Sequence, residues 1–440
     1  MTPEPNSITR LFRACDPNES LHPDDPRYVN CDDVRGEKLA EIFARDLRMA
    51  DPDKPVVKLF AGHRGVGKSS ELLRLKALLE RQDTSRRFFK TVLVNTEESL
   101  DLNDLDFPDL LVLLMGELQK QLPVQIPGFN TESSLFKKVW EDIKELFGAE
   151  MSPKGLEVGP DFMKLALDIK NRPNARKDLR QKIELLNTTL LAAVNDILRE
   201  ANVKLRESMN CGGLVLVVDG LDHLVRRPLE GKTNTHERLF VHRSAQLASL
   251  KAHTIYTVPI SLYYSPQSAE LEQTIGKFLL PLPMIRLREG PRSKLTPQTP
   301  GMKKMWEIME QRCQKANVDI KDIFDSPGTG HYLCEMSGGH PRHLMMFIQA
   351  AAGAVDALPI TRAAADRAIS SYANSLSRQI PDDFWRPLRK FDKPQKRIPK
   401  DDLHPQMLFL LHVFEYMNGE PWYEVNPVVR TISRFRSRRG

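Results

Sequence analysis

Cysteine is scarce in this chain of 440 residues, and the five cysteines that it holds are scattered. None of them stands in a C-x-x-C pair, so the sequence argues against a disulfide framework and a zinc site and favours a reducing cytoplasm. Apolar runs are too short to span a membrane, and the first residues lack the basic and apolar regions of a secretory signal. We therefore expect a cytoplasmic protein without a membrane partner.

The most informative segment is residues 62–69, which read Gly-His-Arg-Gly-Val-Gly-Lys-Ser. This segment fits the G-x-x-x-x-G-K-[ST] phosphate-binding loop in full. An apolar run at 56–61 precedes it, as expected of a buried parallel strand, and a helical pattern follows. Glycines let successive N–H groups turn toward a polyphosphate, and the helix points its positive end at the same anion. A chance match in a Gly-rich turn is the weaker alternative.

The loop motif assigns individual roles. Lys68 is expected to reach the β- and γ-phosphates, and the Ser69 hydroxyl is expected to ligate Mg²⁺. The other residues of this segment that we expect to bind the nucleotide are Gly62, His63, Arg64, Gly65, Val66, Gly67 and Ser70.

Apolar runs at 88–94, 213–218, 254–262 and 278–287 predict further strands. Because they alternate with helical patterns, we expect a three-layer α/β core with a parallel sheet. Residues 127–208 are charged and carry helical periodicity, which predicts an all-helical insertion. Such an insertion serves either as a covering layer for the sheet or as a docking surface.

Asp219 ends the apolar run 213–218, where it is expected to hold Mg²⁺ through water, opposite Ser69. Capping of the turn at Gly220 is the alternative. Hydrolysis also needs a group that orients or deprotonates water. Asp222 is the best candidate and His223 a weaker one, although Asp222 also suits a helix N-cap.

Two further segments supply candidate sensors of the γ-phosphate. Thr257 and Ser261 lie in the run 254–262, where strand alternation would put both on one face, and the register leaves open which one acts. Two glycines and Pro341 break the chain before a helix, which places Arg342 in its first turn, able to reach a γ-phosphate across a cleft. A plain turn with a surface arginine is the alternative.

The last part of the chain combines a hairpin signal with positive charge. Asn418-Gly419 stands between aromatic runs after a helix predicted at 406–414, an arrangement that resembles a winged helix. The net charge of +6 permits a nucleic acid or acidic protein partner without requiring one. Cations gather at Arg386, Arg389, Lys390, Lys393, Lys396, Arg397, Lys400, Arg434, Arg436, Arg438 and Arg439. Such clusters can neutralise phosphates, and a solvated loop with a frayed terminus explains them equally well.

Taken in order, these pieces resemble the AAA-related STAND ATPases and their origin-recognition-like relatives, over roughly residues 32–430. The segment that begins at Arg35 looks like the short family element that precedes the phosphate loop and borders the adenine. Residues 62–69 look like the Walker A motif, and residues 215–222 look like the Walker B motif. Residues 339–342 look like the family element that ends in the second-sensor arginine. The resemblance implies ATP, Mg²⁺ and packing of Pro341 near the adenine. It also implies a lead-in (1–31), a core (32–290), a helical lid (291–378) and a winged-helix-like domain (379–440).

The chain departs from that family at two places. His223 stands where a Walker B glutamate is expected, and no arginine finger ends the segment 269–277. We therefore expect slow turnover and no ring-type activation in trans.

The resemblance implies a regulatory ATPase, a nucleotide-dependent switch that controls a separately encoded effector or regulatory protein, in bacterial anti-phage defence or signalling. Self-association is left open. The alternative is a DNA-binding ATPase of origin-recognition or transposition type, and a third hypothesis is an ATP-bound scaffold that never hydrolyses.

Overall fold

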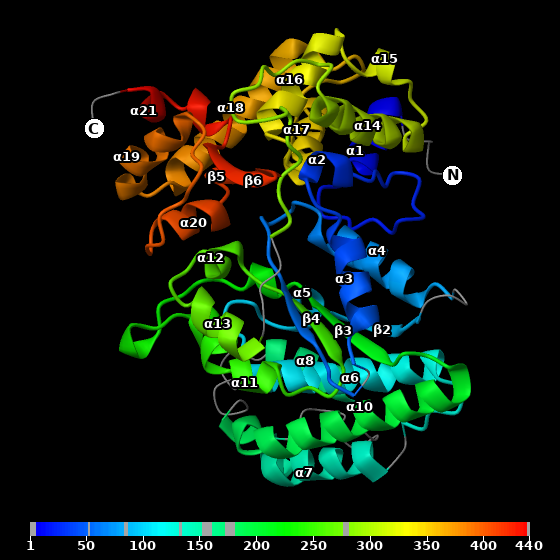
Figure 1. Ribbon diagram of the computed structural model, residues 1–440. Coiled ribbons are helices and arrows are strands. Elements are labelled where there is room, and N and C mark those ends of the chain that lie inside the picture. The colour runs from blue at the N-terminus through cyan, green and yellow to red at the C-terminus, as the bar shows by residue number, and fades with distance from the viewer. Residues whose placement is uncertain are drawn as a thin grey trace.

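The computed structural model describes residues 6–51, 53–82, 87–131, 134–151, 161–171, 181–275 and 281–437. At its centre lies a four-stranded parallel sheet in the order β1-β4-β3-β2 (Figure 1). The strands are β1 Val57–Phe60, β2 Lys90–Asn95, β3 Leu214–Asp219 and β4 His253–Thr257. The segment 62–67, called the P-loop below, joins β1 to a helix, so the sheet presents the loop at its carboxyl edge.

Helices cover both faces of this sheet. On β3, Leu214, Leu216 and Val218 face one core, while Val215 and Val217 face another. The first core is closed by α6 (Phe107–Gln125) and α10 (Asn187–Met209), and the second by α3 (Leu39–Met49) and α4 (Lys68–Glu80). The period of two along the strand thus feeds two apolar layers, which confirms the predicted three-layer α/β core.

Further helices lie at the end of the molecule opposite the C-terminal helices (Figure 1). Helix α8 (Phe162–Asn171) packs on α6, and α7 (Ser134–Met151) packs on α10; both lie within the predicted insertion. Trp140 of α7 and Phe162 of α8 are buried in the same core as α6. Because α6 is covered on this side too, it is apolar almost all round, which favours the covering-layer interpretation. Positions 152–160 and 172–180 of the predicted insertion lie outside the described residues.

The region after the core is mostly helical. Its long helices are α14 Pro300–Lys315, α16 Pro327–Ser337, α17 Pro341–Ala352 and α18 Arg362–Gln379. They share a core with α1 (Ser7–Ala14) from the N-terminus. Shorter helices among the described residues include α2 Asp32–Arg35, α5 Thr96–Ser99, α11 Ser244–Leu247, α12 Ile260–Tyr263, α13 Ser268–Ile275, α15 Ile320–Ile323, α19 Trp385–Leu388, α20 His404–Phe409 and α21 Ser433–Arg436. Among the described residues, no helix is long and apolar enough to cross a membrane.

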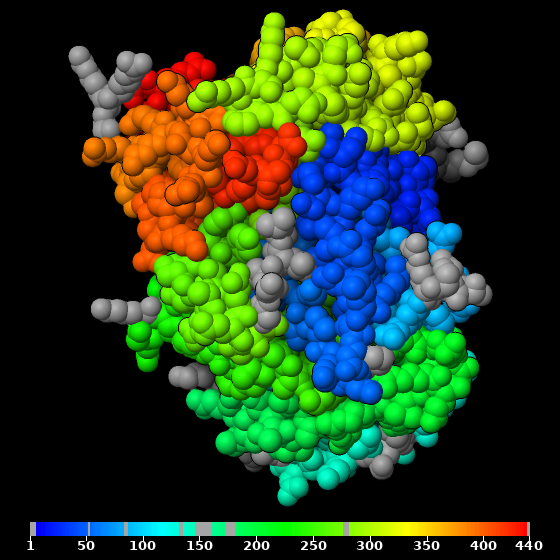
Figure 2. All heavy atoms as spheres, viewed as in Figure 1, coloured from blue at the N-terminus to red at the C-terminus, as the bar shows by residue number. Residues whose placement is uncertain are grey.

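The predicted hairpin is present as β5 Val413–Asn418 and β6 Glu420–Val425, antiparallel and closed at Gly419. Its aromatic side chains Phe414, Tyr416 and Trp422 pack into the core formed by α3 and α4. Figure 2 shows the hairpin (red) against the N-terminal part of the chain (blue), and Met417 of the hairpin lies against Gly36. The hairpin is therefore held on the core, and the winged-helix assignment of this region stays a prediction.

Three predicted elements end differently in the structure. The run 254–262 is a strand only to Thr257, because Pro259 leads into α12, so Ser261 lies on a helix and shares no strand face with Thr257. The helix predicted at 406–414 ends at Phe409, and the chain turns through Leu411 at a positive φ.

The run 278–287 forms no strand in its described part, 281–287. Leu282 makes a single parallel bridge beside β1, and its N–H donates to Ala61 O at 2.9 Å. The next amides donate to different partners, Met284 to Glu415 and Ile285 to Gly339. A ladder cannot continue when successive amides bond to separate segments.

Candidate nucleotide-binding site

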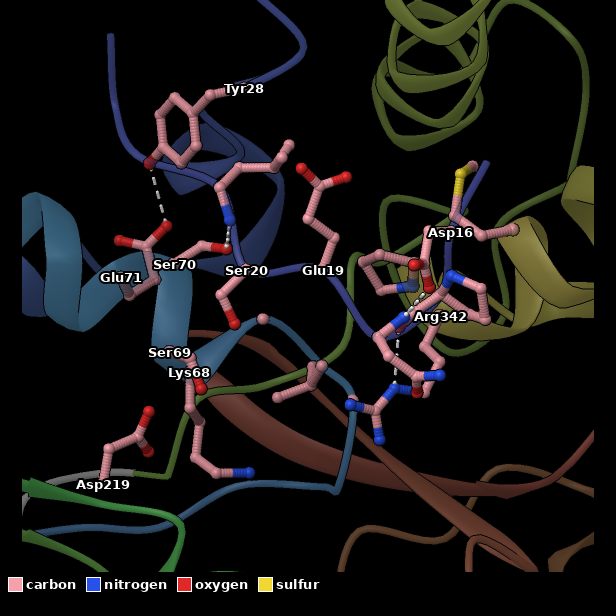
Figure 3. A pocket seen from close by; sticks show the side chains of 18 of the residues that line it. Asp16, Glu19, Ser20, Tyr28, Lys68, Ser69, Ser70, Glu71, Asp219 and Arg342 are labelled. Carbon is pink, nitrogen blue, oxygen red and sulfur yellow. Dashed lines mark hydrogen bonds between the residues drawn. The ribbon is translucent and has the colours of Figure 1, made fainter. Parts of the chain in front are cut away.

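A cavity of about 390 Å³ opens above the P-loop, and this volume is typical of small-molecule sites. Its lining comes from four parts of the chain: the N-terminal segment 16–31, the loop with the start of α4, the ends of β2 and β3, and the helices α14 and α17. Figure 3 shows Lys68, Ser69 and Asp219 on one side of the cavity and Arg342 on the other.

The loop backbone has the conformation that anion binding requires. Gly65 and Gly67 adopt φ of 76° and 107°, values in which an L side chain is strained. Gly67 is the N-cap of α4, and no side chain caps the helix there, so its first N–H groups remain available to an anion. The cavity touches 65–70, whereas Gly62, His63 and Arg64 do not line it.

Lys68 is buried at the floor of the cavity. Its Nζ donates to Gly62 O at 3.0 Å and His63 O at 2.7 Å. The same atom lies 2.9 Å from Asp222 Oδ2, and both side chains are less than 5% exposed. A buried charge needs a partner. That partner is Asp222.

The two predicted magnesium ligands come together. Ser69 opens α4, Asp219 ends β3, and both line the cavity. Burial and the nearby charge of Asp222 raise the pKa of Asp219, while hydrogen bonds from Ser69 and the Gly220 N–H oppose this shift. A hydroxyl and a carboxylate beside a phosphate site are the oxygen donors that Mg²⁺ takes, completed by water and phosphate oxygens, so the residues present fit this ion.

The candidate bases lie just beyond Asp219. Asp222 belongs to a short 3₁₀ turn, Leu221–His223, whose N-cap is Gly220, so Asp222 does not cap a helix. His223 Nε2 lies 3.5 Å from Asp222 Oδ2, and His223 Nδ1 contacts the carboxylate of Glu97. The sequence analysis did not identify Glu97, which lies on α5 directly after β2.

Of the two candidate sensors, Thr257 at the end of β4 lies closer to the site than Ser261 on α12. Its Oγ1 accepts from the Leu221 N–H at 3.1 Å, which ties the end of β4 to the turn that carries Asp222. Thr257 is fully buried and does not line the cavity. Ser261 is placed elsewhere, in a separate small hollow beside Arg226, because α12 turns it away from the strand.

Side chains from outside the loop hold its carbonyl groups. Arg35 donates to Val66 O at 2.7 Å, and His340 Nε2 donates to Arg64 O at 2.7 Å. Arg35 lines the cavity but donates to Val66 O and Pro283 O, so it positions the loop.

His63 was predicted to bind nucleotide, but its side chain points into the C-terminal region. Nδ1 donates to Leu408 O at 3.0 Å, and Nε2 accepts from the Glu415 N–H at 3.0 Å. Burial lowers the pKa of His63 to about 3, so the ring is neutral and these two roles fix its tautomer. His63 therefore links the loop to α20 and β5.

Arg342 reaches the loop from α17, in whose first turn it lies. A Cβ built on Gly65 would come within 2.7 Å of Arg342 Cδ, so only glycine leaves room for this side chain. Arg342 Nε also donates to Pro17 O at 3.1 Å. Pro341 lines the same cavity beside Ile308, Met345 and Val29, an apolar end that suits a nucleobase.

The N-terminal segment forms part of the site, although its sequence predicted only an extended lead-in. The Leu21 N–H donates to Ser70 Oγ at 3.0 Å, and the Tyr28 hydroxyl donates to Glu71 at 3.0 Å (Figure 3). Polar, proline-containing sequence without periodicity gave no signal of this contact.

These features define the fold and site of a P-loop NTPase. No family model matches the chain, and no curated protein matches it. Among solved structures, it is similar to the Walker-type ATPase PABY2304 of Pyrococcus abyssi, with 15% identity over 97% of this chain and 100% of the other, and a TM-score of 0.42.

Two further similar structures are origin-recognition proteins. The Aeropyrum pernix ORC2 protein, in ADPNP–ADP complexes, shares 13% identity over 96% of each chain, with a TM-score of 0.42. Drosophila ORC bound to DNA shares 9% identity over 98% of this chain and 93% of the other, with a TM-score of 0.41. Likeness at this distance transfers no function, so the functional assignment depends on the residues of this chain.

Proposed function

We propose that the protein binds ATP with Mg²⁺ in this cavity, hydrolyses it slowly and uses the bound nucleotide as a switch. The observation that carries this proposal is the meeting of Lys68 from the core and Arg342 from α17 at one phosphate loop. Mg²⁺, held at Ser69 and Asp219, would neutralise charge on the β- and γ-phosphates.

The residues of the chain divide the remaining work. The glycine turns of the loop aim N–H groups at the phosphates, and Lys68 exchanges Asp222 for a phosphate oxygen. Arg342 lies across the cavity from Asp219, so a γ-phosphate between them would draw α17 toward the core. A ligand shifts a conformational equilibrium only through contacts that differ between the two states. Arg342 supplies such a contact for ATP and lacks it for ADP.

The first experiment tests nucleotide binding by titration calorimetry with ATP and ADP. We expect Lys68→Ala to abolish measurable ATP binding. Lys58→Ala is the matched control. Lys58 lies on β1, the strand that leads into the loop, but it pairs with Asp46 of α3 and lies outside the cavity. Equal ATP affinity for wild type and Lys68→Ala would refute the site.

The second experiment tests the switch. Limited proteolysis and small-angle scattering with ATP and with ADP should differ for the wild type. Arg342→Ala should retain ADP binding and lose this difference. The effector or regulatory protein that the switch would control is a further part of the proposal, and so is its role in anti-phage defence or signalling. Once a partner is isolated, its binding should change with Lys68→Ala, and unchanged binding would contradict the switch.

A second candidate function, DNA binding, is favoured by the cations of the segment 385–400. Five are exposed, and the described residues give them no acidic partner: Arg386, Lys390, Lys393, Arg397 and Lys400. Neighbouring cations are engaged, such as Lys396 with Glu420, while Arg438 and Arg439 lie outside the described residues. Unpaired surface cations release counterions when they meet phosphates.

Duplex binding measured across salt concentrations tests this alternative. We expect affinity to fall steeply with salt and to weaken in the double variant Arg397→Glu, Lys400→Glu. The control variant is Lys137→Glu, Lys138→Glu on α7, at the opposite end of the molecule (Figure 1). Binding that does not depend on salt, or that both variants weaken equally, would remove DNA from consideration.

A further inference from the structure

The turn after Asp219 lacks the glutamate that would activate water, and the neighbouring strand brings one to the same place. β2 pairs with β3 in a register that sets Asn95 opposite Asp219. Helix α5 begins directly after Asn95, so Glu97 lies beside the turn at Gly220. A Cβ built on Gly220 would come within 2.9 Å of Glu97 Cγ, and Glu97 lines the cavity.

His223 occupies the space between this glutamate and the phosphate end of the cavity. Its Nδ1 contacts the Glu97 carboxylate, and its Nε2 lies 3.5 Å from Asp222 Oδ2. Asp222 Oδ2 is in turn 2.9 Å from Lys68 Nζ, the atom that binds phosphate in such loops. The imidazole therefore presents Nε2 toward the expected position of the γ-phosphate, while Glu97 holds the other ring nitrogen.

We propose that His223 is the general base of ATP hydrolysis and that Glu97 is its positioning residue, which rests on the proposed ATPase function. In this assignment the Glu97 carboxylate, which Nδ1 contacts, would take the Nδ1–H and leave the lone pair on Nε2, as in other carboxylate–histidine pairs. Nε2 takes a proton from water as the water oxygen bonds to the γ-phosphorus. The bond from phosphorus to the bridging oxygen breaks, ADP leaves with that electron pair, and the proton passes from the imidazolium to phosphate or solvent.

The charges that face His223 keep it neutral before the reaction. Burial lowers the pKa of His223, and so do the positive charges of Arg64, Lys68 and Arg342, so the imidazolium needs these charges to be countered when it forms. After ATP binds, the phosphates engage Lys68, and Asp222 is freed to stabilise the imidazolium together with Glu97. Asp222 on its own is a less favourable base, because its carboxylate is paired with Lys68.

Single-turnover hydrolysis and ATP affinity, measured on the same preparations of the full chain, test the assignment. We expect His223→Ala to lower the hydrolysis rate by about 100-fold or more, with ATP affinity changed less than about threefold. Added imidazole should restore part of the lost rate, which no structural role of His223 would produce. Glu97→Gln should lower the rate without changing ATP affinity, and Glu97→Asp should recover part of it.

Two control variants separate the proposed roles from general effects of mutation. Glu141→Gln alters an exposed carboxylate on α7, and His242→Ala alters an exposed histidine; both lie outside the cavity. Both should hydrolyse ATP at the wild-type rate.

A wild-type rate in His223→Ala, or a lowered rate without imidazole rescue, would overturn the assignment of the base. A wild-type rate in Glu97→Gln would overturn the positioning role. If the wild-type protein binds ATP but never hydrolyses it, this inference fails while the nucleotide site stands. If it binds no ATP, the proposed function itself fails.

Discussion

The buried pair between Lys68 and Asp222 predicts an unusual response to nucleotide. Without ligand, Asp222→Asn leaves the Lys68 ammonium with two backbone carbonyls and without the carboxylate that pairs with it. Removal of one partner from a buried ion pair typically costs about 3–5 kcal/mol. We expect a loss of this size in the free energy of unfolding without ligand.

ATP should reverse much of this loss, because its phosphates replace the missing carboxylate at Lys68. Ligand at 100 times its dissociation constant stabilises a native state by about 2.7 kcal/mol. In the wild type, ATP binding must break the ion pair between Lys68 and Asp222, and this cost reduces the net binding free energy. In Asp222→Asn nothing is separated, so the variant should bind ATP more tightly and gain more stability from it.

Thermal unfolding with and without ATP measures both effects in one experiment. Asp46→Asn is the control, because Asp46 forms a partly exposed pair with Lys58 outside the cavity. Exposed pairs typically contribute about 0–1 kcal/mol, so the control should be weakly destabilised by the same amount with or without ATP. An ATP-induced stabilisation of Asp222→Asn that is no larger than that of the wild type would refute the proposed exchange of partners. Repeating the thermal unfolding with ATP but without Mg²⁺ shows whether the effect of Asp222 depends on bound metal instead.

Two further predictions concern the contacts behind the site. Gly339→Ala should destabilise the protein by about 3 kcal/mol, because the φ of Gly339 is +77° and a Cβ would come within 1.8 Å of Ile285 O. The control is Gly419→Ala, at φ +73° in open space, which should cost only about 1 kcal/mol. Chemical denaturation measures both changes in the free energy of unfolding. Burial raises the pKa of Glu415 to about 8, against a hydrogen bond from Tyr264 that lowers it. The folded protein thus retains a proton that the unfolded chain loses above about pH 4.3, so the free energy of unfolding should fall as pH rises from there to about 8. Glu415→Gln should flatten this pH dependence, as measured by denaturation curves at several pH values. An unchanged pH dependence in the variant would contradict the prediction.

Residues close together in sequence made much of the site predictable. The phosphate loop needs only a strand, two glycine turns and a helix in succession, and residues 56–75 display all of them. Asp219 was recognisable because a polar residue ends a continuous apolar run. The hairpin followed from Asn418-Gly419, where the turn chemistry is local.

What could not be predicted depends on pairing between distant segments. Glu97 reaches His223 only because β2 and β3 are neighbours in a given register, which no local pattern specifies. Ser261 was misplaced because an apolar run of this length fits a strand or a buried helix equally well, and here Pro259 separates the two. The N-terminal segment lacks any periodicity, and its position is set by bonds such as that from Leu21 to Ser70.

The loop is held by hydrogen bonds from the protein itself, and this determines where a signal can originate. Four of its carbonyls accept hydrogen bonds from Lys68, His340 and Arg35, and leaving a buried acceptor unpaired costs about 1–3 kcal/mol. These bonds turn the carbonyls away from the cavity and leave the N–H groups facing it, so ATP has little ordering of the loop to drive. The binding free energy of the γ-phosphate can then stabilise a new contact between the core and α17. Arg342 is the cation placed across the cavity to make one, and its bond to Pro17 carries any movement of α17 into the N-terminal segment.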